Sequence, residues 1–109
     1  MIFNQGDIIW LDFDPQAGHE QKGRRPAIVV SNNTFNRFTR AAMVCPITST
    51  DRELSLQIKL DSRTKTQGVI MCEQVKALDL TKRNAQFIEK VPPDIIGDVV
   101  DMVYSFVEM

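Results

Sequence analysis

The chain has 109 residues, of which 43% are hydrophobic and 25% charged, and its formal net charge is −1. This length and composition predict one globular domain and exclude a disordered chain. No apolar run approaches the ~20 residues of a membrane-spanning helix, and residues 1–7 lack the basic start and apolar core of a signal peptide. We therefore expect a cytoplasmic protein with no membrane contact.

The two cysteines, Cys45 and Cys72, lie in apolar, strand-like runs and do not form a Cys-x-x-Cys pair. We expect two buried free thiols in a reducing cytoplasm. A structural zinc site is not expected, because two cysteines and one histidine provide only three soft ligands. The sequence predicts neither a metal nor a cofactor.

The charges are distributed unevenly along the chain. From residue 21 to residue 50 there is no acidic residue, whereas five are basic: Lys22, Arg24, Arg25, Arg37 and Arg40. From residue 89 to residue 109, five carboxylates stand against Lys90 alone. A basic region on a nearly neutral protein predicts a local anion site, and a solvated surface is the simpler alternative.

In chain order, the first strand is predicted at residues 7–13, with Trp10 as its largest anchor. The segment 18–26 follows as a polar loop that holds two glycines, one histidine, one carboxylate and three cations. Loops of this kind, carried on buried strands, commonly bear functional groups. Pro26 suits the first residue of the next strand, because its φ is fixed. We therefore expect Arg25 to end the loop just before that strand.

The next elements are short. Residues 32–37 are polar and turn-rich, and Thr34 is expected to cap a single helical turn. Residues 41–48 return to strand character, and Pro46 should restrict this strand to an edge or a bulge. Over residues 54–60, leucine and isoleucine alternate with polar residues, which predicts a half-buried strand with one wet face.

In the C-terminal half the spacing of apolar residues changes from that of strands to that of a helix. Residues 68–78 predict one buried strand, 81–84 a turn and 86–88 a short last strand. After the prolines at 92 and 93, apolar residues recur at spacings of three and four as far as Val107, which predicts an amphipathic helix with a wide buried face. Many short strands followed by one helix favour a small, strongly bent sheet or barrel with the helix packed on it.

Arg25 and Thr48 are the strongest candidates for chemistry. The guanidinium of Arg25 presents a planar fork of donors that matches a phosphate group. Thr48 lies in a hydroxyl-rich corner with Ser49 and Thr50. Phosphoryl transfer needs little beyond positioning and charge stabilisation, which such groups supply. Taken alone, Arg25 could equally form a surface ion pair, and Thr48 could be a turn residue.

Five further polar residues are candidates for support of the site. His19 is the only histidine and a candidate general acid or base, although beside Glu20 it could equally be a surface residue. Glu20 and Gln21 are expected to fix the loop through hydrogen bonds to neighbouring N–H groups. Glu73 and Gln74 lie inside a strand-like run, where polar groups are usually paired, and they could brace the same loop.

Several segments together resemble the MazF/PemK (Kid) toxin family. The most specific is the glycine-Glu-Gln loop at 18–27 that leads to Arg-Pro; the others are residues 6–15, 46–48, 73–79 and the terminal helix. The resemblance covers nearly the whole chain. It implies an SH3-like small β-barrel of the CcdB/MazF-like toxin fold with a C-terminal helix, as a single domain over residues 1–109, and a homodimer.

The resemblance also implies an activity: a sequence-specific, metal-independent endoribonuclease toxin that cleaves single-stranded mRNA and so inhibits translation and growth. The products would carry a 2′,3′-cyclic phosphate and a 5′-hydroxyl, and an acidic, MazE-like antitoxin would neutralise the toxin. On matching positions the catalytic residues are Arg25 and Thr48, with Glu20 near the site. Serine is common in the family where this chain has His19, which weakens a catalytic role for that histidine. The residues expected to bind RNA are Lys22, Arg24, Arg25, Arg37, Arg40, Ser49 and Thr50.

Two alternatives remain at this level. A non-enzymatic toxin that poisons DNA gyrase, as CcdB does, would share the fold but would not need the Arg25 and Thr48 pair. An inactive RNA-binding domain would keep the basic region without the chemistry. Assays of the purified protein for RNA cleavage and for gyrase-dependent DNA breaks distinguish the endoribonuclease from the gyrase poison.

Overall fold

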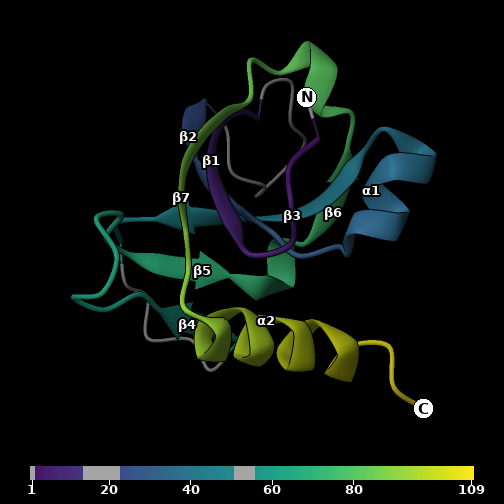
Figure 1. Ribbon diagram of the computed structural model, residues 1–109. Helices are drawn as coiled ribbons and strands as arrows, with labels where there is room; N and C mark the ends of the chain where they lie inside the picture. Colours follow the sequence, from purple (N-terminus) through teal and green to yellow (C-terminus); the bar gives the residue numbers. More distant parts are fainter. Residues whose placement is uncertain (1, 14–22, 51–55) are drawn as a thin grey trace.

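Figure 1 shows the computed structural model, which describes residues 2–13, 23–50 and 56–109. The elements, in chain order, are β1 (Asp7–Asp12), β2 (Arg24–Val29), α1 (Asn33–Thr39), β3 (Ala42–Thr48), β4 (Gln57–Lys59), β5 (Val69–Met71), the 3-10 turn η1 (Cys72–Gln74), β6 (Lys76–Leu78), the 3-10 turn η2 (Leu80–Lys82), β7 (Gln86–Lys90) and α2 (Pro93–Ser105). The strands form one antiparallel sheet in the order β4-β5-β3-β2-β1-β7, and β6 also pairs with β3. The expected β fold with a C-terminal helix is confirmed.

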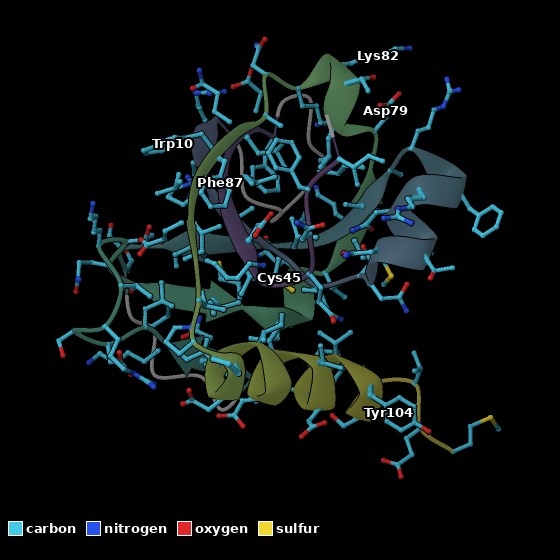
Figure 2. The ribbon with its side chains drawn as sticks, viewed as in Figure 1. Trp10, Cys45, Asp79, Lys82, Phe87 and Tyr104 are labelled. Atoms are coloured by element: carbon cyan, nitrogen blue, oxygen red, sulfur yellow. The ribbon has the colours of Figure 1, made fainter. Side chains whose placement is uncertain are left out.

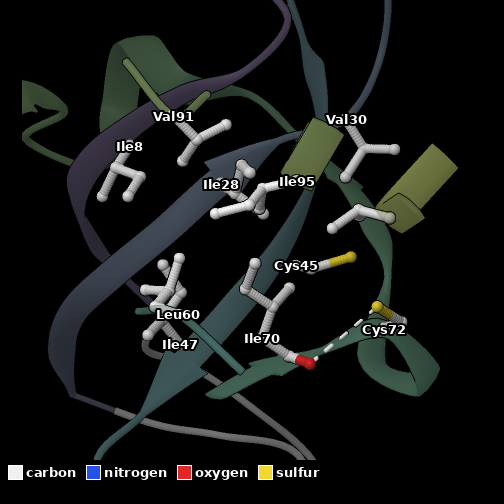
Figure 3. Packing of buried hydrophobic residues seen from close by; sticks show 11 residues of the cluster. Ile8, Ile28, Val30, Cys45, Ile47, Leu60, Ile70, Cys72, Val91 and Ile95 are labelled. Atoms are coloured by element: carbon white, nitrogen blue, oxygen red, sulfur yellow. Dashed lines mark hydrogen bonds between the residues drawn. The ribbon is translucent and has the colours of Figure 1, made fainter. Parts of the chain in front are cut away.

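The strongly curved sheet has an apolar cluster on each face. One cluster is closed by Ile95 and Val99 of α2 and includes Ile8, Ile28, Cys45, Ile47 and Ile70 (Figure 3). The other includes Ile9, Leu11, Phe13, Ala27, Val29 and Val44. We call the first side the helix face and the second the opposite face. Because side chains alternate along a strand, the cluster that a residue's neighbours join identifies the face on which it lies.

The second strand begins earlier than the sequence suggested. Arg24 and Arg25 are its first two residues, so Arg25 lies in the strand and not at the end of a loop. Pro26 is therefore inside β2, opposite Trp10 of β1. The ladder between β2 and β3 starts only at Ala27, so the missing N–H of Pro26 costs no hydrogen bond on that side.

The prediction for residues 32–37 was wrong in length and in its cap. Helix α1 runs from residue 33 to residue 39, and Asn32, not Thr34, is its N-cap. The side chain of Asn32 accepts a hydrogen bond of 2.9 Å from the N–H of Phe35. Asparagine and threonine are both common N-cap residues, and here Asn32, the residue directly before α1, is the N-cap.

Pro46 was predicted to restrict β3 to an edge or a bulge, and the edge is wrong. β3 is an interior strand, with β2 on one side and both β5 and β6 on the other. On that second side, pairing with β6 ends at Val44 and pairing with β5 begins at Ile47. Pro46 therefore falls between two ladders, where no strand requires its N–H.

The predicted strands at 54–60 and 68–78 are both shorter in the structure. β4 contains only Gln57–Lys59, and Leu56, expected to be buried, is 43% exposed. Residues 51–55 lie outside the described part of the chain. The second run is divided by η1, so Glu73 and Gln74 occupy a 3-10 turn and not a strand. This turn moves the chain from β5 to β6 along the same edge of β3.

Both thiols are free and buried, as predicted. The sulfur atoms of Cys45 and Cys72 face one another within the helix-face cluster (Figure 3). A hydrogen bond with the Cys72 thiol, together with burial, raises the pKa of the Cys45 thiol well above its usual value. Cys45 is therefore a protonated core residue and not a nucleophile.

Helix α2 packs beneath β4 and β5 in the view of Figure 1. Its predicted apolar face is confirmed at Ile95 and Val99, which are buried. The prediction fails at the C-terminal end, because the helix stops at residue 105 and Val107 is 74% exposed. Tyr104 is 63% exposed and points away from the sheet (Figure 2). No helix in the described part of the chain has the length and apolar character needed to cross a bilayer.

Candidate active site

Arg25 lies on the opposite face of the sheet, away from α2. Its partner in the β1–β2 ladder is Leu11, which belongs to the opposite-face cluster. Cross-strand partners share a face, so the arginine side chain leaves the sheet on that side. It is half-buried at the start of β2, and pairing with β1 fixes its backbone more firmly than a loop would.

Thr48 is the last residue of β3 and is only 7% exposed. It follows Val44 and Pro46 at intervals of two along the strand, so it shares the opposite face with Val44. Its hydroxyl oxygen accepts a hydrogen bond of 3.2 Å from the N–H of Thr50. This bond orients the hydroxyl and leaves its proton available for donation.

The strand register brings Arg25 and Thr48 together. The β2–β3 ladder pairs Val29 with Val44 and ends at the pair of Ala27 and Pro46. Two residues further along each strand, in the same register, stand Arg25 and Thr48. Both lie on the opposite face, at the point where the ladder ends. The two candidates that the sequence separates by more than twenty positions thus flank one place on the sheet.

Gly68 holds the backbone of Thr48 from the side of β5. Its φ is +123°, and a Cβ added to it would lie 2.2 Å from the carbonyl oxygen of Thr48 and 3.3 Å from the Cα of Ser49. Its own carbonyl accepts a hydrogen bond of 2.9 Å from Leu60. Only glycine permits both this conformation and this close approach.

Lys76 is a residue of this region that the sequence did not single out. It pairs with Val44 across the β3–β6 ladder and so lies on the opposite face. Its ammonium group is 5.6 Å from the centre of the Phe13 ring, a geometry that suits a cation–π contact. Lys76 therefore places a second cation on the side of the sheet that carries Arg25. Lys76 lies in the segment 73–79 that resembles the family, but only the strand register shows that it shares a face with Arg25.

Arg24 belongs to a different surface. Alternation directs it to the face away from Arg25, where its guanidinium donates to Asp12 at 3.0 Å and to Gln86 at 2.9 Å. Hydrogen bonds from Asn84 and then from Arg24 hold the pKa of Asp12 below its usual value. The structure therefore does not bring Arg24 to the same place as Arg25 and Thr48, although the sequence analysis named Arg24 with Arg25 among the residues expected to bind RNA.

The other predicted residues that the structure describes lie in three places: beside α1, directly after β3, and in η1. Arg37 and Arg40 border a pocket of about 580 Å³ beside α1, at the end of β3 that starts with Ala42. That end is roughly 20 Å from Thr48, from the rise of an extended strand. Ser49 and Thr50 directly follow Thr48 and are exposed.

Glu73 is exposed and Gln74 is half-buried, both in η1 next to β3. Four of the predicted residues lie outside the described part of the chain: His19, Glu20, Gln21 and Lys22. Among the residues that the structure does describe, no three histidine, cysteine, aspartate or glutamate side chains gather as a metal site would require.

The chain is similar over residues 4–107 to the family described as PemK-like, MazF-like toxin of type II toxin-antitoxin system. Endoribonuclease PemK of Escherichia coli is 37% identical over 100 residues, which cover 88% of this chain and 75% of that protein. Endoribonuclease toxin MazF of Escherichia coli K12 is 34% identical over 91 residues, which cover 84% of this chain and 81% of that protein.

Solved structures agree. The crystal structure of MazF (Form-I) from Deinococcus radiodurans matches with a TM-score of 0.93 and 33% identity, and it covers 100% of this chain and 99% of that one. A crystal structure of MazE-MazF (Form-II) from the same organism matches with a TM-score of 0.84 and 27% identity, over 100% of this chain and 98% of that one. The similarity therefore includes the strands that carry Arg25 and Thr48.

Proposed function

This chain belongs to the PemK-like, MazF-like toxin family of type II toxin–antitoxin systems, and we propose that Arg25 and Thr48 carry its endoribonuclease activity. The observation that supports these roles is the register that brings both residues to one place at the end of the β2–β3 ladder. The toxin acts in the cytoplasm, where the mRNA that it cleaves is found.

The reaction needs no group beyond the RNA and the protein. The 2′-oxygen of a ribose forms a bond to the adjacent phosphorus, and the bond from phosphorus to the 5′-oxygen breaks. One proton leaves the 2′-hydroxyl and one reaches the departing 5′-oxygen, so the products carry a 2′,3′-cyclic phosphate and a 5′-hydroxyl. Arg25 stabilises the negative charge that develops on the phosphate oxygens, and Thr48 donates a hydrogen bond to the same phosphate.

Neighbouring groups on the same side of the sheet extend this site along the RNA strand. The hydroxyls of Ser49 and Thr50 follow Thr48 directly, and Lys76 adds a cation held above Phe13. Lys22 and its neighbours in the segment 18–23 are expected to contribute further contacts. Arg37 and Arg40 lie beside the far end of β3. They would therefore bind RNA only where the RNA strand continues past the cleavage site.

Cleavage of one long, defined single-stranded RNA by the purified protein tests this function. We expect cuts at one short recurring sequence and no effect on gyrase-catalysed DNA supercoiling. The relatives named above are endoribonucleases, which favours RNA cleavage over the poisoning of gyrase. Gyrase-dependent DNA breaks without RNA cleavage would establish the alternative.

We propose that a small antitoxin with an acidic segment neutralises this toxin, as the MazE-MazF complexes among the similar structures suggest. Carboxylates of such a segment would compete with RNA phosphates for Arg25 and Lys76. The Kd of the complex should rise as NaCl is raised from 50 mM to 500 mM, because salt screens exposed charge pairs. Titration calorimetry measures this, and a complex that cleaves RNA at the full rate would contradict the competition.

The protein is expected to form a homodimer. Large apolar side chains stay exposed on the single chain, among them Trp10, Phe87 and Tyr104, and a two-fold partner would cover some of them. Trp10 and Phe87 lie far from Tyr104, which is near the end of α2 (Figure 2). Light scattering at micromolar concentration should give twice the mass of the 109-residue chain. Replacement of Tyr104 by aspartate tests whether the end of α2 contributes, since a buried charge there would shift the mass toward that of the monomer. A wild-type protein that remains monomeric at this concentration would refute the dimer.

A further inference from the structure

Thr48 is held on one side by a hairpin that is attached to β3 through a short ladder. Strands β4 and β5 and the connection 60–68 between them form this hairpin, which we call the outer hairpin. In the described part of the chain, β5 pairs with β3 at Ile47–Ile70 and at Thr48–Val69, so Thr48 stands in the terminal pair of the ladder. The ends of paired elements open at the lowest cost in free energy. The position of Thr48 therefore depends on what else holds the outer hairpin.

The carboxylate of Glu89, on β7, holds the connection of the outer hairpin. It accepts hydrogen bonds from the N–H of Lys65 at 3.1 Å, from the N–H of Thr66 at 2.8 Å and from the hydroxyl of Thr66 at 2.8 Å. Burial raises the pKa of Glu89, but these hydrogen bonds and the charge of Lys65 together hold it below its usual value. Glu89 is therefore ionised at neutral pH, and hydrogen bonds to an ionised acceptor are the stronger kind.

A β-bulge in β7 directs Glu89 toward the outer hairpin. β7 pairs Phe87 with Ile9 but Glu89 with Ile8, so one residue of β7 is extra between these pairs. Because cross-strand partners share a face, Glu89 lies on the face of Ile8, which is the helix face. The apolar cluster of that face includes residues of the outer hairpin. Bulges commonly redirect a side chain in this way, and here the bulge brings the carboxylate to the hairpin.

A second contact ties the same connection to α2, but it is weaker and further from Thr48. Arg63 donates to both carboxylate oxygens of Asp94, each at 2.9 Å. The two side chains are 48% and 61% exposed, and exposed ion pairs contribute little to stability. Thr66, in contrast, is half-buried and lies two residues before Gly68, the glycine that is packed against the carbonyl of Thr48. The contact with Glu89 is therefore the stronger restraint near Thr48.

We propose that Glu89 is a positioning residue for RNA cleavage, which keeps Thr48 in place by clamping the outer hairpin against the sheet. This rests on the role in the endoribonuclease reaction that is proposed above for Thr48. The effect of Glu89 passes through Thr66 and Gly68 to the backbone of Thr48. Without the clamp, the end of the β3–β5 ladder opens more often, and the Thr48 hydroxyl is less often in place to donate to the phosphate.

Glu89→Gln keeps the size of the side chain and weakens the clamp, because a neutral amide accepts hydrogen bonds through one oxygen only. We expect the single-turnover rate at saturating RNA to fall by about 10-fold to 10²-fold, since displacement of a catalytic group by about 1 Å can cost about 10² in rate. The affinity for a non-cleavable 2′-deoxy analogue of the RNA should stay close to that of the wild type. Thr66→Val, which removes only the hydroxyl bond to Glu89, should lower the rate in the same direction but by less.

Asp79→Asn is the matched control, because it makes the same change in the same kind of contact. The Asp79 carboxylate also accepts from the N–H and the hydroxyl of one threonine, Thr81, at 3.0 Å and 2.6 Å. It caps η2, at the end of the molecule away from the outer hairpin (Figures 1 and 2). We expect Asp79→Asn to lower the thermal midpoint, as Glu89→Gln does, and to leave the cleavage rate unchanged.

A double variant shows whether the effect of Glu89 passes through Thr48. In the Thr48→Ala background, Glu89→Gln should cause no further loss of rate, because no hydroxyl remains to be positioned. Losses that multiply in the double variant would overturn the proposal, since Glu89 would then act independently of Thr48. A wild-type rate for folded Glu89→Gln and Thr66→Val would overturn it as well, and so would an equal loss of rate for Asp79→Asn. Failure of the proposed function is a different result, in which the wild-type protein does not cleave RNA or Thr48→Ala cleaves it at the wild-type rate.

Discussion

Arg25→Ala and Thr48→Ala are each expected to lower the rate of RNA cleavage by about 10²–10³, the usual cost of removing one donor that acts in the transition state. Both variants should stay folded, because Arg25 is half-buried and contributes to neither apolar cluster. Thr48→Ala keeps the strand and loses only the hydroxyl that Thr50 contacts. RNA binding should weaken more for Arg25→Ala than for Thr48→Ala, because a charge contributes to the ground state as well.

Arg24→Ala is the matched control for Arg25→Ala. The two arginines are neighbours on β2, but Arg24 faces the other side of the sheet and is paired with Asp12 and Gln86. Single-turnover cleavage by Arg24→Ala should stay within a few-fold of the wild type. Equal losses for the two variants would show that net charge near β2 matters, and not the position of Arg25.

Gly68→Ala is expected to lower kcat by about 10²-fold, because displacement of a catalytic group by about 1 Å can cost that much. The new methyl group would lie 2.2 Å from the carbonyl oxygen of Thr48, and backbone cannot yield there without a shift of the threonine. The positive φ adds a stability cost of roughly 1–2 kcal/mol. RNA affinity, measured on a non-cleavable 2′-deoxy analogue, should change much less than kcat.

Gly97→Ala separates this positional effect from the general effect of replacing glycine. A Cβ at Gly97 of α2 would have no atom within 4 Å. The change should stabilise the helix by roughly 0.5–1 kcal/mol and leave cleavage unchanged. A folded Gly68→Ala variant that cleaves at the wild-type rate would show that Thr48 does not depend on this contact.

The sequence predicted most elements of the fold because their patterns are local. The spacing of apolar residues located α2, and the apolar runs located β1, β2 and β3. Predictions failed where a residue's environment depends on distant partners. Pro46 predicted an edge or a bulge, yet it lies in an interior strand, because pairing with β6 ends before it and pairing with β5 begins after it. The exposed end of α2 follows from where the helix stops, which its period does not reveal.

The candidate site also has features that the sequence predicted and features that only the strand pairing shows. Residue chemistry and the resemblance to a known family both indicated Arg25 and Thr48, but only the β2–β3 register explains why they meet. Neighbours in sequence proved misleading, since Arg24 adjoins Arg25 and faces the other side of the sheet. Lys76 joins this side of the sheet through pairing with β3, which no single stretch of sequence encodes.

Analysis of the cleavage products is the most direct test of the central claim, that Arg25 and Thr48 promote attack of the ribose 2′-hydroxyl on its own phosphate. A short RNA containing the cleaved sequence is digested in EDTA, and the new termini are identified by mass spectrometry. The same RNA with a single 2′-deoxyribose at the cleaved position serves as the comparison. The account predicts a 2′,3′-cyclic phosphate, a 5′-hydroxyl, full activity in EDTA, and a deoxy-substituted strand that is bound but not cut. A 5′-phosphate product, loss of activity in EDTA, or cleavage of the deoxy-substituted strand would contradict it.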